Sequence, residues 1–354
     1  METSDIDPTI QQQLEAQLKD LVDEPENRRI PLPQVKLGEE LGQAANIKNL
    51  AKKLVARVLE DARLGRQVSV KPIQEVVSKM MESLLKNDDA LLNLSLIKCR
   101  DDYLFQHSVN VGIFIMAIAR SLGLDESIVI EAGVGGLMHD IGMVRISEEI
   151  YTKPGKLTEQ ELRQVQKHVE LGYRLLVRTP GVPDVALIVA GAHHGRQDGS
   201  GYAVSSVLGS HIELQHLAAI VDIYDAMTSP RYYRRAWSAT NALAKIHQMS
   251  LKQQLDSRLV QIFIHHIGIY PVGSVVRLEN QLVGVVIQTN RERLLRPIVR
   301  IVRDARTGKS LDPRDVDLGE YENEQQGYSI VASEQSENWG IDPVVFLPYG
   351  HLYT

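Results

Sequence analysis

The sequence predicts a mainly helical protein with a small β-rich appendage near its C-terminus. Apolar residues recur at helical spacing through most of the segment between residues 46 and 267. After residue 268 the pattern changes to short Val- and Ile-rich runs separated by turn residues, as in the strands of a small sheet. With 44% hydrophobic and 24% charged residues, the composition is that of an ordinary soluble globular protein.

The helices are expected from periodic apolar runs with recognisable ends. Gly123 is expected to end one helix, and Asp125 to cap the next. Thr158 and Glu161 form the pattern of a capping box. The expected helices are Asn46–Leu64, Ile73–Leu92, Val109–Leu122, Glu126–Leu137, Thr158–Leu176, Asp184–Ala192, His211–Met227, Ala239–Met249 and Ser257–His266.

The β appendage is expected from three runs, Gly273–Leu278, Leu282–Thr289 and Pro297–Val302. The polar residues that end the chain predict a loosely packed tail. We therefore divide the chain into four parts, which are a helical N-terminal region (1–80), a helical core (81–268), a β-rich extension (269–320) and a tail (321–354).

Composition and charge exclude several classes of protein. The net charge of −6 gives no sign of a surface for a nucleic acid polymer, and the one cysteine, Cys99, excludes an internal disulfide framework. The acidic, polar start is unlike a signal peptide, and the longest apolar stretch, Val111–Ala119, is too short to cross a bilayer. We expect a cytoplasmic protein without a membrane span.

The middle of the chain contains an ordered set of side chains that bind metals well, and these are His107, His139, Asp140, His168, His193, His194 and Asp222. No single helix could supply them, so the fold must bring distant segments together. A carboxylate offers two anionic oxygens, and Asp140 could therefore bridge two ions. Asp225 follows Asp222 by one helical turn and could orient a ligand. A mixed His and Asp set suits Fe, Mn, Zn or Ni better than Mg or Ca.

Taken singly, these residues are weak indicators. A lone histidine such as His107 or His168 is more often a core or surface residue than a ligand, and His-Asp or His-His pairs arise often by chance. The remaining histidines are assigned to no site, and these are His211, His216, His247, His265, His266 and His351. Only the order of the set, together with the flanking residues, indicates a metal site.

Those flanking residues resemble the HD-GYP family, bacterial phosphodiesterases of the HD superfamily. The resemblance rests on segments 107–111, 139–142, 168–172, 193–202 and 221–231, which occur in the order of the family. It implies an HD-type helical bundle that hydrolyses cyclic di-GMP in bacterial signalling, with either pGpG or GMP as the final product. The β-rich segment that follows also looks like an extension often seen after this domain.

The resemblance implies a metal-binding role for the whole set. The counterparts of four residues hold one ion in the family, and these are His107, His139, Asp140 and Asp222. A second ion is held by the counterparts of Asp140, as the bridge, and of His168, His193 and His194. Two divalent transition-metal ions are therefore implied, with Fe or Mn favoured and Zn or Ni as alternatives, and they would activate a hydroxide at His139 and Asp140.

The resemblance also implies contacts to the substrate. Basic residues after the last aspartate bind phosphate in the family, and Arg231, Arg234 and Arg235 occupy that place. A solvated cluster at a helix start is the other interpretation of these arginines. Tyr202 is expected to contact the substrate, and the glycine-rich loop Gly195–Tyr202 either lines a guanine pocket, docks a signalling partner or only connects two helices.

Four positions depart from the pattern of the family. A lysine that can contact phosphate is replaced by Met143, a glutamate after the His-His pair by Gly195, and the proline of Gly-Tyr-Pro by Ala203. A glutamate that recruits a third metal in some members is replaced by Tyr103, so a third ion is not expected.

Because these changes leave the metal set intact, two functions of different classes remain open. The first is a cyclic di-GMP phosphodiesterase. The alternative is a metal-binding but weakly active or inactive module that senses cyclic di-GMP or docks a signalling partner. An HD phosphohydrolase acting on another nucleotide is a third. By analogy with related proteins, the N-terminal region would be regulatory or would form a homodimer.

Overall fold

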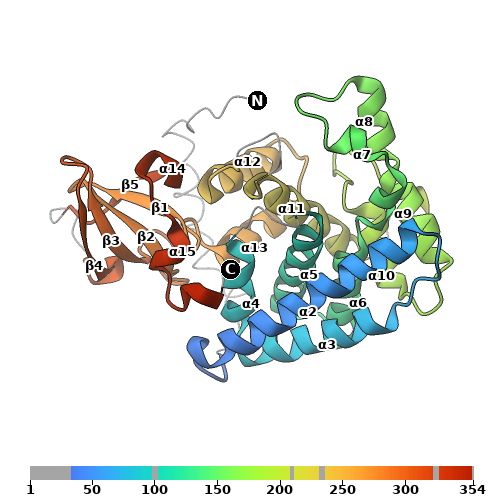
Figure 1. Cartoon of the computed structure of the whole chain (residues 1–354), viewed down its shortest axis with the longest axis horizontal. Coiled ribbons are helices and arrows are strands. Elements are labelled where there is room, and N and C mark those ends of the chain that lie inside the picture. The colour runs from blue at the N-terminus through green and yellow to red at the C-terminus, as the bar shows by residue number, and fades with distance from the viewer. Residues whose placement is uncertain (1–32, 98–102, 208–210, 231–235, 322–326, 353–354) are drawn as a thin grey trace. The chain divides into compact units, whose positions relative to one another are not determined.

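The structure is a computed structural model, which describes residues 33–97, 103–207, 211–230, 236–321 and 327–352 of the chain (Figure 1). Contacts divide it into two compact units. A helical unit comprises Arg29–Ala236 and Gln248–Val260. A second unit comprises the described residues of Trp237–His247 and Gln261–Thr354, and it contains the sheet. The boundaries of these two units differ from those of the four predicted parts of the chain. The four-part division stays a prediction.

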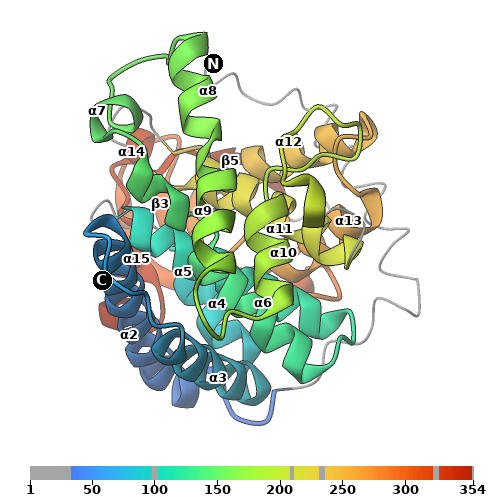
Figure 2. The ribbon, with the colours of Figure 1, turned by 90° about the vertical axis from the view of Figure 1, so that its right-hand side faces the viewer.

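The helical unit contains all the predicted metal ligands. Its longer helices are α2 (Leu37–Arg63), α3 (Lys71–Lys86), α4 (Asp88–Leu96), α5 (Tyr103–Ser121), α6 (Glu126–Met138), α8 (Glu159–Gln166), α9 (His168–Val177), α10 (Asp184–Ala192) and α11 (Ile212–Thr228). Short helical segments η2 (Ile141–Arg145), α7 (Glu148–Tyr151) and η3 (Ser205–Val207) lie between them. Figures 1 and 2 show α8 projecting from the end of α9. Two further helices, α12 (Ala239–Leu251) and α13 (Ser257–Ile267), each contribute residues to both units.

Helix α5 lies at the centre of the helical unit. Its residues from Val109 to Ala119 are buried on every side of the helix, as expected for a core helix with an apolar surface all round. A β-carbon added to Gly136 in α6 would lie 2.6 Å from the Cα of Gly112 in α5. Only glycine allows the two backbones to approach so closely, and this approach brings the C-terminal end of α6 against α5.

One apolar stretch, Glu126–Arg145, is long and apolar enough to cross a membrane by length and composition alone. A buried core helix satisfies the same criteria, and 61% of the 18-residue apolar window within this stretch is buried inside the structure. Because it includes His139 and Asp140, it carries part of the predicted metal site and belongs to the core of the helical unit.

Most predicted helices are present, but α2 and α5 begin earlier than predicted, at Leu37 instead of Asn46 and at Tyr103 instead of Val109. The predicted range Asp184–Ala192 is that of α10, and the capping box of Thr158 and Glu161 is present. The predicted helix Ile73–Leu92 is wrong as one element, because Asn87 is extended and its side chain caps α4. The predicted Thr158–Leu176 is likewise two helices, which break at Lys167 directly before His168. Asp125 precedes α6 but makes no capping hydrogen bond through its side chain.

The second unit contains a five-stranded antiparallel sheet. Its strands are β1 (Val275–Leu278), β2 (Leu282–Gln288), β3 (Ile298–Asp304), β4 (Ser310–Asp317) and β5 (Ile330–Glu334), in the order β4-β3-β2-β1-β5. The sequence analysis missed β4 and β5. The expectation of a loosely packed tail is therefore wrong for β5, because Val276 pairs with Ser333 and Arg277 with Ala332. Two short helices, α14 (Ser336–Trp339) and α15 (Pro343–Phe346), follow.

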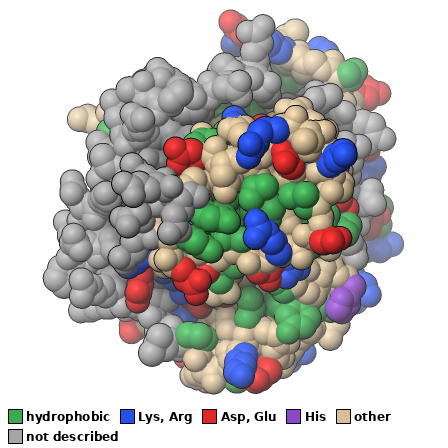
Figure 3. Space-filling view, turned by 90° about the vertical axis from the view of Figure 1, so that its left-hand side faces the viewer, with side chains coloured by type: hydrophobic (Ala, Val, Ile, Leu, Met, Phe, Trp, Pro, Cys, Tyr) green, Lys and Arg blue, Asp and Glu red, His purple; other side chains and the backbone are tan. Residues whose placement is uncertain are grey.

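The described surface of this second unit has an apolar area. Figure 3 shows hydrophobic side chains gathered between Lys or Arg and Asp or Glu side chains on one face. The exposed apolar side chains of the second unit include Leu311, Val331, Val345 and Tyr349. Polar residues are mixed among them, as on an ordinary protein surface.

We predict that replacing Gly142 with alanine destabilises the helical unit. A β-carbon at Gly142 would lie 1.9 Å from the backbone oxygen of His168 and 2.6 Å from the nitrogen of Gly172, so η2 and α9 would have to separate. The free energy of unfolding should fall by about 1–3 kcal/mol, measured by urea denaturation followed by circular dichroism. Gly42→Ala in α2 is the matched control, because a β-carbon there meets nothing within 4 Å. Equal midpoints for the two variants would contradict the close contact of η2 with α9.

Candidate metal centre

The seven predicted ligands converge in the helical unit, most of them at helix ends. His139 and Asp140 lie between α6 and η2, His168 is the first residue of α9, and His193 and His194 follow α10. His107 and Asp222 project from within α5 and α11 instead. A helix end places a side chain at a fixed point and leaves space beside it, so several ends can meet around a small polar centre. The rest of the helix can meanwhile be buried in the apolar core.

Asp140 lies between two groups of histidines, with one carboxylate oxygen toward each. Its Oδ2 lies 3.4 Å from Nε2 of His139 and 3.7 Å from Nε2 of His107. Its Oδ1 lies 3.2 Å from Nε2 of His168 and 3.8 Å from Nε2 of His193. This is the arrangement that a carboxylate needs to bridge two cations.

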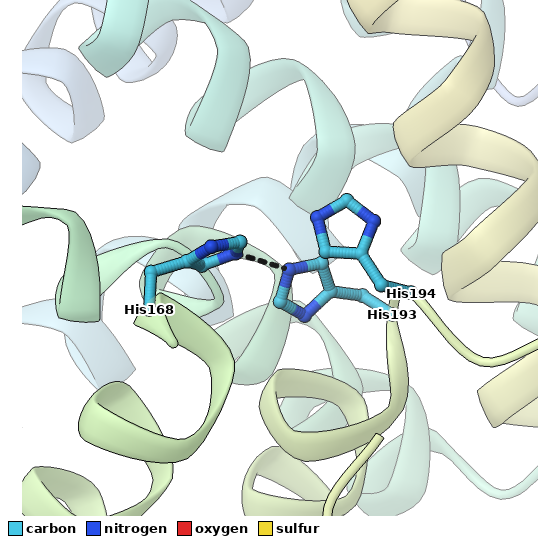
Figure 4. A group of neighbouring side chains, drawn as sticks. All are labelled: His168, His193 and His194. Atoms are coloured by element: carbon cyan, nitrogen blue, oxygen red, sulfur yellow. Dashed lines mark hydrogen bonds between the residues drawn. The ribbon is translucent and has the colours of Figure 1, made fainter. Parts of the chain in front are cut away.

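The histidines on the Oδ1 side form a compact cluster of His168, His193 and His194 (Figure 4). The Nε2 atoms of His168 and His193 are 3.2 Å apart. The potential ligand atoms of this cluster all lie within 4.8 Å of one another, and the same holds for His107, His139 and Asp140. Two groups of donors therefore lie on opposite sides of one carboxylate.

Asp222 also faces both groups. Its Oδ1 lies 3.2 Å from Nε2 of His107, and its Oδ2 lies 3.4 Å from Nδ1 of His194. The resemblance to the family implied that Asp222 serves one ion only. In the structure its carboxylate lies near donors expected for both ions, so it adds negative charge to the whole centre.

Hydrogen bonds fix the orientation of four of the five histidines. Three of them use the same local arrangement, in which Nδ1 bonds to the backbone oxygen three residues earlier. The bonds are His139 to Gly136 at 2.8 Å, His168 to Val165 at 2.7 Å, and His193 to Ala190 at 2.8 Å. A carbonyl oxygen can only accept, so Nδ1 carries a proton in each of these rings, and Nε2 is the nitrogen that faces the centre.

Asp225 performs the same role for His107. Its Oδ2 lies 2.7 Å from Nδ1 of His107. Asn110 donates to its Oδ1 at 3.0 Å, and the hydroxyl of Ser229 donates to Oδ2 at 3.3 Å. The residue predicted to orient a ligand therefore contacts a predicted ligand, and it is held in place by two neighbours.

The pKa shifts of Asp140, Asp222 and His194 suit cation binding, whereas that of His168 opposes it, because Asp140 outweighs burial and raises the pKa of this ring. Burial raises the pKa of Asp140, but the His139 and His168 rings outweigh burial and hold that pKa well below its usual value. Burial likewise raises the pKa of Asp222, but the His194 and His107 rings outweigh burial and lower that pKa. Burial lowers the pKa of His194 to about 4. Near neutral pH both carboxylates are therefore charged and His194 is neutral, as ligands must be.

The donor set fits divalent transition metals. Imidazole nitrogens and carboxylate oxygens together suit Fe, Mn, Zn or Ni. The buried Nε2 of His139 has no hydrogen-bond partner among the described residues, although a buried polar atom normally has one. A cation between His139 and the neighbouring carboxylates would satisfy this atom.

The predicted substrate contacts are only partly described. Arg231, Arg234 and Arg235 lie outside the described residues. Tyr202 lies against the centre, with its ring centroid 4.6 Å from that of His194. Met143 is half-buried in η2, and Ala203 packs against an apolar cluster that includes Ala192.

The sequence analysis missed Arg196, which lies in the glycine-rich loop directly after the His-His pair. Its side chain is half-buried, and its Nη1 donates to the backbone oxygen of Gly195 at 2.6 Å. Burial lowers the pKa of Arg196, and the negative charge of Asp222 acts in the opposite direction. The signal in the sequence was the position of Arg196, two residues after the predicted ligand His194. In the structure Arg196 adds a positive charge beside the centre.

Comparisons with known proteins agree with this geometry. Residues 92–259 match the family model described as HD domain, and residues 275–325 match that of the KOW domain associated with HD domain. The chain is 35% identical over 306 residues to "Cyclic di-GMP phosphodiesterase PA4108" of Pseudomonas aeruginosa, a match that covers 86% of this chain and 73% of that protein.

Two further similarities are more limited. The chain is 32% identical over 178 residues to "3'3'-cGAMP-specific phosphodiesterase 1" of Vibrio cholerae, which covers 50% of this chain and 41% of that protein. The solved structure of "Bd1817, a HDG"Y"P protein from Bdellovibrio bacteriovorus" has a TM-score of 0.51 at 16% identity, and covers 72% of this chain and 77% of that one. This structural match supports the fold.

We predict that Asp225→Asn weakens metal binding although it removes none of the seven predicted ligands. The amide oxygen of Asn can still accept from Nδ1 of His107, but it carries no negative charge. The ring therefore loses its charged anchor. Metal affinity should fall by about 10–100-fold, measured with Mn²⁺ by competition against a chelator. The control is Asp184→Asn, an equal change of charge at an exposed position in the first turn of α10. Unchanged affinity in Asp225→Asn would exclude this role.

Proposed function

We propose that this chain, which belongs to the HD-GYP family of HD-domain proteins, is a metal-dependent phosphodiesterase that hydrolyses cyclic di-GMP to pGpG, with GMP as the alternative final product. The observation that carries the proposal is the position of Asp140, with one carboxylate oxygen toward each of two groups of histidines. The named activity of the Pseudomonas aeruginosa relative supports the choice of substrate, because the similarity extends over most of both chains.

The centre would hold two divalent ions, and we favour Fe or Mn, with Zn or Ni as alternatives. One ion would be held by His107, His139, Asp140 and Asp222. The other would be held by Asp140, His168, His193 and His194. When bound, such a pair of ions supplies Lewis-acid activation of the phosphodiester and of water.

The residues of the chain contribute positioning and charge. The Nδ1 hydrogen bonds hold four imidazoles with Nε2 toward the centre, so little reorganisation is needed when cations bind. The carboxylates of Asp140, which is partly buried, and of Asp222, which is buried, supply the negative charge that attracts the cations. Arg196 adds a positive charge near the centre, where a phosphate would lie, and so offsets part of the loss of lysine at Met143. Arg231, Arg234 and Arg235 remain proposed phosphate contacts.

We also propose partners and a location for the protein. We propose that the protein is cytoplasmic, forms a homodimer and binds no nucleic acid polymer. The loop Gly195–Tyr202 is proposed to dock signalling proteins. The apolar stretch at Glu126–Arg145 supports no membrane span, since most of it is buried in the helical unit.

The proposal is tested by turnover of cyclic di-GMP with purified protein loaded anaerobically with Fe²⁺ or Mn²⁺. We expect pGpG as a product, and we expect His139→Ala to reduce the rate at least about 100-fold, because His139 places an unpartnered ring nitrogen in the centre. His351→Ala, an exposed histidine outside the centre, is the control and should leave the rate unchanged. Full turnover by His139→Ala would show that the reaction occurs elsewhere. A metal-loaded protein without turnover would favour the sensing or docking module.

A second candidate substrate is 3'3'-cGAMP. The named specificity of the Vibrio cholerae relative favours it, at an identity close to that of the Pseudomonas aeruginosa protein but over a shorter match. Competition between the two dinucleotides in one reaction compares their kcat/KM values directly. We expect cyclic di-GMP to be consumed first, and preferential loss of 3'3'-cGAMP would reverse the assignment.

A further inference from the structure

His194 differs from the other four histidines of the centre. Its side chain is 21% exposed, whereas those of the other four are at most 3% exposed. The backbone anchor that holds His139, His168 and His193 through Nδ1 is absent here, because Nδ1 of His194 points to Asp222 at 3.4 Å. The ring of His194 therefore lacks a backbone anchor and is held by contacts with other side chains.

The ring of Tyr202 covers His194. Their centroids are 4.6 Å apart and their planes are inclined by 30°, close to a stacked arrangement. Tyr202 also meets His168 edge to face, at 6.4 Å and 89°. Aromatic contacts of this kind favour particular ring orientations, and here the Tyr202 ring acts together with the ring of His193, whose centroid lies 4.3 Å from that of His194.

The loop is built to hold Tyr202 in this place. The backbone N–H of Tyr202 donates to the oxygen of His194 at 3.0 Å, and that of Gln197 donates to the oxygen of Gln254 at 3.1 Å. Gly201 allows the return of the chain, because a β-carbon there would lie 2.3 Å from the oxygen of His194. The loop therefore closes back on the same residue that its tyrosine covers.

We propose that Tyr202 is a positioning residue, whose ring orients His194 as a metal ligand and so sets the affinity of the centre for one of its two ions. The proposal rests on the proposed two-metal function and changes the expected role of Tyr202 from substrate contact to ligand support. The ring of Tyr202, and not its hydroxyl, would orient His194, since no described residue hydrogen-bonds to that hydroxyl. The loop thereby links its own conformation to the occupancy of the Oδ1 side of Asp140.

The test is the binding of Mn²⁺ alone, without substrate, measured by calorimetry and by metal content after gel filtration. Wild-type protein should bind two ions per chain. Tyr202→Ala should bind the first ion with wild-type affinity and the second about 10–100-fold more weakly. Tyr202→Phe should keep both affinities, because it keeps the ring. Gly201→Ala should resemble Tyr202→Ala, because it displaces the loop.

Tyr173→Ala is the matched control, since it removes a partly buried tyrosine that packs near the same loop. Thermal unfolding of every variant separates loss of fold from loss of one ion. Two tightly bound ions in folded Tyr202→Ala would overturn the proposal, as would equal weakening in Tyr202→Phe. Fewer than two ions in the wild-type protein would instead overturn the two-metal function. Failure of the inference and failure of the function are therefore distinguishable.

Discussion

The rest of the centre depends on a single, partly buried carboxylate between two groups of imidazoles. Asp140 directs one oxygen to His139 and His107 and the other to His168 and His193. Asp140 and Asp222 lie near the same rings, so their negative charges repel each other. Cations bound between carboxylates and imidazoles would offset this repulsion and the cost of removing the charges from water. The structure is therefore one in which bound cations and a stable core are expected to go together.

Backbone geometry makes this arrangement reproducible. Three histidines use the carbonyl three residues earlier, a bond that a helix end provides without any further residue. Glycines at the crossing of α5 with α6, and of η2 with α9, let the segments that carry His139 and Asp140 approach their neighbours. The ligands are thus held mainly by main-chain atoms and by close packing, which side-chain substitutions elsewhere disturb little.

Two of the four departures from the family pattern lie at the glycine-rich loop, which begins at Gly195 and is followed by Ala203. The other two lie in helical segments, because Met143 is in η2 and Tyr103 is in α5. The main-chain anchors of the histidine rings end at His193, and beyond it the arrangement depends on ring contacts and on the loop. The loop departures therefore lie beside His194, the ligand whose ring has no backbone anchor.

The sequence by itself determined the donor set, the helical class and the ends of helices such as α10, because these depend on residue type and on local periodicity. It did not determine that Asn87 and Lys167 break two predicted helices, since extended caps and turns compete with helix propensity only in context. The sequence did not predict strands β4 and β5 either. Strand β4 is largely exposed, and β5 is a strand because it pairs with β1. Only the tertiary structure decided that Asp222 faces both groups, that Asp225 holds His107, and that Tyr202 covers His194. Each of these contacts joins residues from different segments, and the distance between two side chains on separate segments follows from how those segments pack.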